Sequence, residues 1–137
     1  MWWIYALLSA VFAALTAIFA KIGIKGVDTD LATAIRTVVI LLIAWAIVLI
    51  KSTGSGIGSL TRLNWIFLVL SGCATGLSWI FYFKALQLGK VSQVAPVDKL
   101  SVAIAIILSV IFLGEPLTLK SASGAVLIIA GTLVLIF

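Results

Sequence analysis

Histidine is absent from this sequence of 137 residues, and cysteine occurs once. A chain without His and with a single Cys cannot hold a disulfide framework, and neither a metal site nor a Cys/His catalytic pair is plausible in it. Charge is also scarce, because 9% of the residues are Asp, Glu, Lys or Arg and only 4 of them are acidic. We therefore expect no metal, no cofactor and no enzyme activity.

Hydrophobic residues take the place of the missing charge and make up 64% of the sequence. A typical soluble domain is nearer half apolar and a quarter charged. A chain this apolar cannot cover its own core with polar surface, so we expect its partner to be the lipid bilayer. In a membrane protein, the net charge of +5 is first of all a signal for orientation in the membrane. We therefore expect no nucleic-acid partner.

Five long apolar stretches divide the chain. A transmembrane helix needs roughly 20 mostly apolar residues to cross about 30 Å of hydrocarbon. The sequence predicts an all-α integral membrane protein, a single domain over residues 1–137 built as a bundle of five transmembrane helices. We expect these helices at about residues 2–20, 31–50, 63–84, 92–113 and 119–137. The Gly/Ser-rich stretch 52–61 is expected to be a flexible linker without structure of its own.

Basic residues are distributed almost evenly between the two membrane faces that five spans would define. The N-terminal face receives Lys51, Arg62 and Lys120, and the C-terminal face receives Lys21, Lys25, Lys84 and Lys90. This weak bias favours the C-terminus inside. It also leaves insertion in both orientations open.

Polar side chains within the predicted spans gather toward the C-terminal face. They are Arg36, Trp79, Tyr82, Asp98 and Lys99. Charge inside a membrane is costly and by default marks a functional surface, so we expect these residues to line a solute path. Basic groups outnumber acids there, which favours a carboxylate-bearing or zwitterionic solute over a bare cation. Structural alternatives stay open: Asp98 could serve only as an ion-pair partner of Lys99 or Arg36, and the two aromatic residues could be packing or interfacial side chains.

Small residues and one proline bear on how the helices pack. Gly72 and Gly76 form a GxxxG pattern, and Gly124 and Gly131 lie one heptad apart. Such residues let helix backbones approach closely in lipid, within one chain or, for the last helix, between two copies. In the fourth span, Pro96 removes the helix bond to the carbonyl of the residue four positions before it.

The run from Phe81 to Ile136 resembles the EamA-like repeat of the drug/metabolite transporter superfamily. The matching pieces are FYFKAL, VAPVDKLSV, LGEPLT and SGAVLIIAG. The resemblance implies a secondary transporter or exporter of small metabolites, placed as a multi-pass protein in the inner (plasma) membrane of a bacterium or archaeon.

Most relatives carry two such repeats with inverted halves, whereas this chain has one. The resemblance therefore implies a homodimer, possibly antiparallel, that works by alternating access. The smallest members of the superfamily couple transport to protons through an acid in the first helix. The first predicted span of this sequence contains no acid. Asp98 would therefore have to take over the role of the proton-coupling acid. The alternative function is a membrane scaffold or accessory subunit that pairs with another membrane protein.

Overall fold

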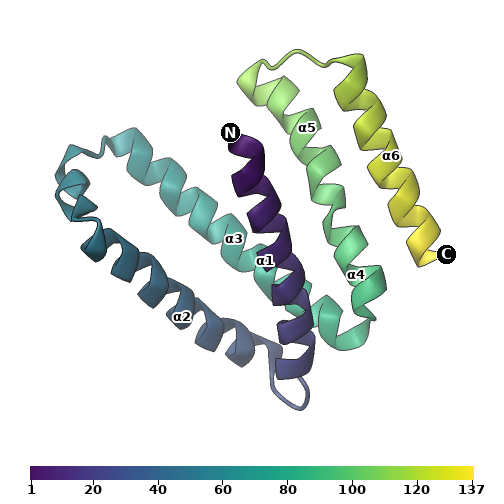
Figure 1. The fold of residues 1–137 in the computed structure, drawn as a ribbon, viewed down its shortest axis with the longest axis horizontal. Helices are drawn as coiled ribbons and strands as arrows, with labels where there is room; N and C mark the ends of the chain where they lie inside the picture. Colours follow the sequence, from purple (N-terminus) through teal and green to yellow (C-terminus); the bar gives the residue numbers. More distant parts are fainter. The chain divides into compact units, whose positions relative to one another are not determined.

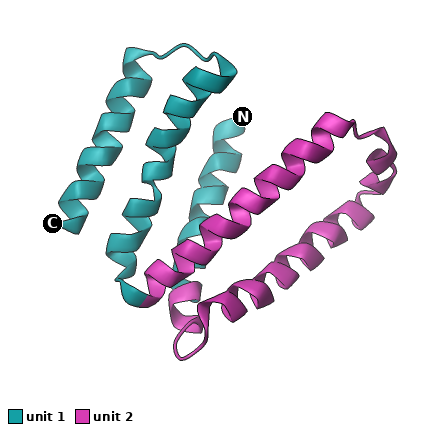
Figure 2. Cartoon of the chain, turned by 180° about the vertical axis from the view of Figure 1, so that it is seen from behind, with its two compact units in different colours: residues 1–19, 88–137 teal, residues 20–87 magenta.

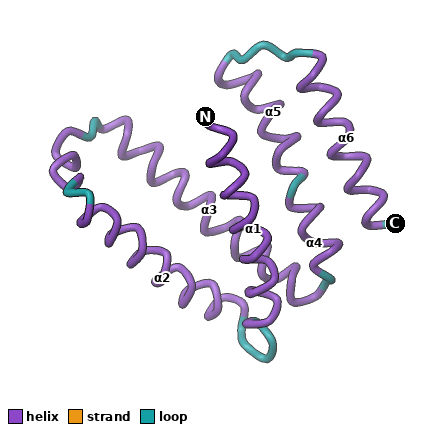
Figure 3. The backbone as a smooth tube through the Cα atoms, viewed as in Figure 1, coloured by secondary structure: helices purple, strands orange, loops and turns teal.

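Helices make up nearly the whole of this protein, and no strand is present (Figure 1, Figure 3). The computed structural model describes all residues, 1–137. The elements are α1 (Trp2–Gly23), α2 (Thr29–Ile50), the short 3-10 helix η1 (Thr53–Ser59), α3 (Arg62–Leu88), α4 (Val91–Asp98), α5 (Leu100–Leu113) and α6 (Leu119–Ile136). Five segments are long and apolar enough to cross a membrane, and α4 with α5 forms the fourth of them. The predicted fold class is confirmed.

Large apolar side chains cover the surface of these helices. Ile111 and Phe112, for example, are 66% and 78% exposed. The few buried side chains are Ala17, Ile24, Thr29, Thr33, Phe83, Leu86, Ala103 and Thr132. Such a surface would be unstable in water and suits hydrocarbon. The protein is therefore a multi-pass membrane protein.

The chain divides into two compact units, residues 1–19 with 88–137 and residues 20–87 (Figure 2). In the first of these, which we call unit 1, α6 packs along both α4 and α5. The connection from α5 to α6 turns at Gly114, whose φ of 66° is favourable for glycine. Thr118 and Ser121 then begin α6 with a capping box, each side chain bonding the backbone N–H of the other at 3.1 Å.

Unit 2, residues 20–87, contains the α2–η1–α3 hairpin and the last turn of α1. Two side chains fasten the end of α3 to the last turn of α1 and to the connection that follows it. Lys21 Nζ donates to the carbonyl of Leu86, a favourable position for a cation at a helix C-terminus. Gln87 Nε2 donates to the carbonyl of Val27 at 3.2 Å. The start of α2 and the end of α3 are thereby held at the same end of this unit.

Helix ends depart from the sequence expectation by a few residues. The second helix begins at Thr29 and not near residue 31, because the Asp28 carboxylate accepts bonds from the backbone N–H groups of Asp30 (2.9 Å) and Leu31 (3.1 Å). α1 and α3 continue past Lys21 and Lys84, respectively. Lys21 is accommodated within α1 because its ammonium group bonds the carbonyl of Leu86, and Lys84 can extend its ammonium group toward the headgroups without ending α3.

One expectation about local structure was wrong, and the irregularity expected near Pro96 is found a few residues further on. Residues Thr53–Ser59 form a 3-10 helix where a structureless linker was expected, with Ser59 Oγ donating to the carbonyl of Gly56 at 2.7 Å. The fourth span, expected at about residues 92–113, covers Val91–Leu113 and consists of the two helices α4 and α5. It is interrupted at Lys99, three residues after Pro96, which is visible as a short break between α4 and α5 (Figure 3).

Candidate functional site

The side chain of Arg36 lies against aromatic rings inside unit 2. Its guanidinium carbon is 3.5 Å from the ring centroid of Trp79 and 4.9 Å from that of Phe83. Arg36 is on α2 and both rings are on α3, so the contact joins two membrane-spanning segments. A guanidinium over a ring face is attracted by the negative face of the ring, and this attraction strengthens where water is excluded.

Three aromatic residues of α3 form one cluster around this cation. Trp79 and Tyr82 meet edge to face with ring centroids 5.7 Å apart, and Trp79 and Phe83 lie at 5.6 Å. Spacings of three and four residues place these side chains on one helix face. The structure therefore brings together Arg36, Trp79 and Tyr82, three of the five residues predicted for the solute path. We call these three residues together with Phe83 the Arg36 cluster.

Phe83 is the member that sequence analysis missed. Its side chain is 1% exposed, and it contacts Arg36 as well as the other two rings. The available signal was its position four residues after Trp79, on the same helix face. An apolar ring in an apolar span is ordinarily a packing residue, so the spacing alone did not single it out.

Arg36 has aromatic neighbours but no carboxylate partner in its unit. It is half-buried and lies seven residues into α2, about 10 Å along the helix axis. The acids of unit 2 are Asp28, which caps α2, and Asp30 in the first turn, and neither forms an ion pair with it. A stacked guanidinium keeps N–H donors at its edges, in the fork geometry that matches a carboxylate. This cluster is therefore suited to bind an anionic group.

Asp98 and Lys99, the other two predicted path residues, lie in unit 1 at the break between α4 and α5. Lys99 Nζ is 3.3 Å from the Asp98 carboxylate, so the ion pair that the sequence suggested as a structural alternative is present. Both groups remain accessible, with side-chain exposures of 57% for Lys99 and 35% for Asp98. Their role on a solute path stays a prediction.

The glycines predicted to mediate helix packing lie on open surface within their units. Around Gly72 and Gly76 on α3, and around Gly124 and Gly131 on α6, nothing comes within 4 Å of the place where a Cβ would stand. These positions are thus not filled by neighbours in the same unit. Helix packing at these glycines stays a prediction, and it concerns a surface beyond the unit itself.

Metal-ligating side chains do not gather anywhere in the chain: no group of three or more His, Cys, Asp or Glu is present. Cys73, the single cysteine, is exposed and free. The polar chemistry of the spans is therefore that of a cation on aromatic rings in one unit and an accessible ion pair in the other.

The apolar helices indicate a membrane protein, and the stacked cation within one of its spans marks a candidate functional site. Comparison with known proteins agrees, since the model of the EamA-like transporter family matches residues 1–137. The chain belongs to this family.

Two individual proteins are similar to this chain, and the first of them supports the same assignment. A protein of Sinorhizobium sp., described as an uncharacterized transporter in the cobO 3' region, is 50% identical over 134 residues, which cover 98% of this chain and 95% of the relative. An uncharacterized protein of Methanocaldococcus jannaschii is 36% identical over 69 residues, half of each chain. No solved structure matches the chain. The family and the first relative support a membrane transporter and point away from an enzyme.

Proposed function

We propose that this protein is a secondary transporter of small metabolites in the inner membrane and that its solute carries a carboxylate, alone or in a zwitterion. The observation that carries the proposal is Arg36, which lies inside a span, stacks on Trp79 and Phe83, and has no carboxylate partner in its unit. Leaving such a charge unpaired in a membrane is costly. A solute carboxylate would supply the missing counter-charge, and removing it again would return the site to its starting state.

Aromatic stacking suits a site that must also release its solute. A permanent Arg–carboxylate ion pair within the chain would compete with the solute for the guanidinium donors. The faces of Trp79 and Phe83 stabilise the cation without occupying those donors. Arg36 can therefore stay charged between transport cycles while its donors remain open to a carboxylate.

The second part of the proposal is that two copies form the transporter, in antiparallel orientation, and work by alternating access. One five-helix repeat provides one set of polar residues toward one membrane face. Two oppositely inserted copies would provide a set at each face, the arrangement that inverted repeats give in larger transporters. The almost even distribution of basic residues between the two faces permits insertion in both orientations.

Uptake by proteoliposomes tests this function. The purified protein is reconstituted, and vesicles are supplied separately with labelled acetate, succinate, glutamate, glycine and tetraethylammonium. We expect saturable uptake of at least one carboxylate or zwitterion above protein-free vesicles, and none of tetraethylammonium. Uptake of tetraethylammonium alone, or of no probe at all, would contradict the proposal.

A further inference from the structure

The break between α4 and α5 has an unusual pattern of backbone hydrogen bonds. Pro96 has no N–H and cannot bond the preceding turn. Just beyond it, the N–H of Lys99 donates to the carbonyl of Pro96 at 3.0 Å and to that of Ala95 at 3.3 Å, and the N–H of Val102 donates to the carbonyl of Lys99 at 3.0 Å. Bonds over three residues mark a local tightening of the helix, which often accompanies a hinge.

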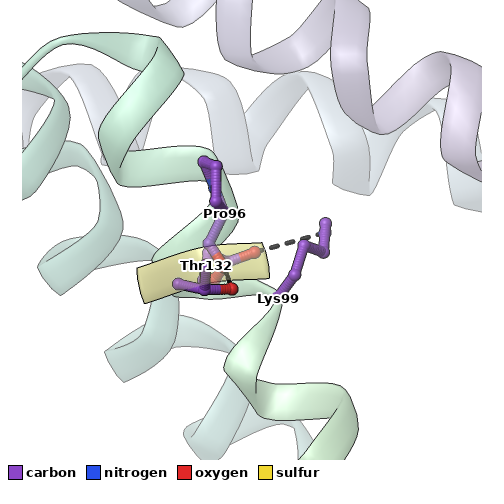
Figure 4. A network of polar contacts seen from close by, with 4 residues as sticks. Pro96, Lys99 and Thr132 are labelled. Carbon is purple, nitrogen blue, oxygen red and sulfur yellow. Dashed lines mark hydrogen bonds and ion pairs between the residues drawn. The ribbon is translucent and has the colours of Figure 1, made fainter. Parts of the chain in front are cut away.

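Thr132 of α6 reaches this break from the neighbouring helix. Its hydroxyl oxygen lies 3.1 Å from the carbonyl oxygen of Pro96, and Figure 4 shows these two residues close together. The same hydroxyl oxygen lies 2.8 Å from the carbonyl oxygen of Ile128, one turn earlier on α6. The bond to Ile128 is ordinary for a threonine in a helix. The bond to Pro96 spans 36 residues of sequence and joins α6 to the interrupted helix.

Burial strengthens the argument that this contact matters. Thr132 is 3% exposed and is one of the few buried side chains of the protein. The carbonyl of Pro96 already accepts the N–H of Lys99 at 3.0 Å, and the Thr132 hydroxyl is a second donor to the same oxygen, from a neighbouring helix. The hydroxyl carries a single hydrogen, so at any moment it donates either to the carbonyl of Pro96, across to the break, or to the carbonyl of Ile128 in its own helix.

We infer that Thr132 is a positioning residue: its hydroxyl fixes the hinge at Pro96–Lys99 and thereby sets the direction of the Asp98 and Lys99 side chains. These two residues are the last of α4 and the residue at the break itself, so a change in the local backbone redirects both. The consequence for transport rests on the proposed function, because it assumes that Asp98 and Lys99 line the solute path. The fixing of the hinge does not depend on that assumption.

Amide hydrogen exchange on the full-length protein in detergent micelles tests the inference. Thr132→Val keeps the shape of the side chain and removes the hydroxyl, and Thr132→Ser keeps the hydroxyl. Thr75→Val is a matched control, because the hydroxyl of Thr75 donates only to the carbonyl of Ser71 in its own helix, at 2.8 Å. Exchange is followed by mass spectrometry in peptides covering residues 97–102 and, for comparison, residues 104–113.

We expect Thr132→Val to accelerate exchange at residues 97–102 by about fivefold, the effect of losing one net hydrogen bond. Thr132→Ser and Thr75→Val should exchange at those residues as the wild type does. Unchanged exchange in Thr132→Val would overturn the inference, and so would equal acceleration in Thr132→Ser or over residues 104–113. A wild type that carries no probe would refute the proposed function while leaving this exchange result in place, so the two failures are distinguishable.

Transport supplies a second readout that a merely structural role would not move. Using the carboxylate or zwitterion that the wild type carries, we expect Thr132→Val to lower the maximal uptake rate with little change in the half-saturating concentration. Thr132→Ser should restore the rate. A rate that stays low in Thr132→Ser would overturn the positioning role of the hydroxyl.

Discussion

Arg36 of α2 and Trp79 of α3 form a stacked pair, with the guanidinium carbon 3.5 Å from the centroid of the ring. This relationship explains how a cation can persist inside a span without an acidic partner in its unit. The aromatic face offsets part of the cost of burial, while the edge donors of the guanidinium stay open to a carboxylate. The first and the last of the predictions below depend on this pair.

Replacing Arg36 separates the role of its charge from that of its shape. Arg36→Gln removes both, and we expect it to lower carboxylate uptake by at least about tenfold, as for the loss of a charged hydrogen bond. Arg36→Lys keeps the charge but loses the planar fork and the flat stacking surface, so its uptake should be intermediate. Initial uptake rates in proteoliposomes with matched protein content measure the effect. Uptake by Arg36→Gln at the wild-type rate would refute the site.

Asp98 provides a test in unit 1. We expect Asp98→Asn to abolish transport while insertion into the membrane and thermal stability are unchanged. The Asp98–Lys99 ion pair is accessible and joins neighbouring residues, and such a pair is worth less than about 1 kcal/mol. Glu115→Gln makes the same chemical change in the connection between α5 and α6 and should transport normally. If Asp98→Asn transports as well as Glu115→Gln does, Asp98 is only an ion-pair partner.

The buried end of unit 2 should carry much of its stability. Leu86 is fully buried, whereas Leu68 on the same helix is 59% exposed. We expect Leu86→Ala to lower the free energy of unfolding by about 3 kcal/mol, since it leaves a cavity. Leu68→Ala should have a much smaller effect, because its side chain has few protein neighbours to lose. Thermal unfolding in one detergent compares the two variants, and equal Tm values would contradict this account of the core.

Antiparallel pairing is tested by labelling single cysteines from each side of intact cells. The cysteines replace Ser55 on η1 and Phe137 at the end of the sequence, in a Cys73→Ala background. We expect both positions to be labelled from both faces, because a fraction of the copies inserts each way. One fixed orientation would exclude the antiparallel homodimer and would favour an accessory subunit that pairs with another membrane protein.

The sequence determined the spans well because their physics is local. A run of twenty apolar residues must be helical in lipid. The end of each run can be read from the sequence without knowing which helices pack beside it. The N-terminal end of α2 was also within reach of sequence analysis, since Asp28 is a standard capping residue. The break at Lys99 was harder to predict, because Pro96 indicates an irregular helix but does not identify the residue at which the helix is interrupted.

Contacts between helices are where sequence analysis had least power. Arg36, Trp79 and Tyr82 could be selected because polar and aromatic groups within a span are conspicuous. Phe83 and Thr132 could not, since a phenylalanine and a threonine in a transmembrane helix are ordinary residues until a neighbouring helix is placed beside them. Their significance lies in long-range contacts, to Arg36 and to the carbonyl of Pro96, which no local pattern encodes.

The most direct test of the carboxylate site is fluorescence of Trp79 itself. The other four tryptophans, Trp2, Trp3, Trp45 and Trp65, are replaced by Phe, and the protein in lipid nanodiscs is titrated with glutamate, succinate, glycine and tetraethylammonium chloride. We predict a saturable change in Trp79 emission with at least one carboxylate or zwitterion, none with tetraethylammonium, and loss of the response in Arg36→Gln. A Trp79 signal that no carboxylate alters, or a response that persists in Arg36→Gln, would contradict the account.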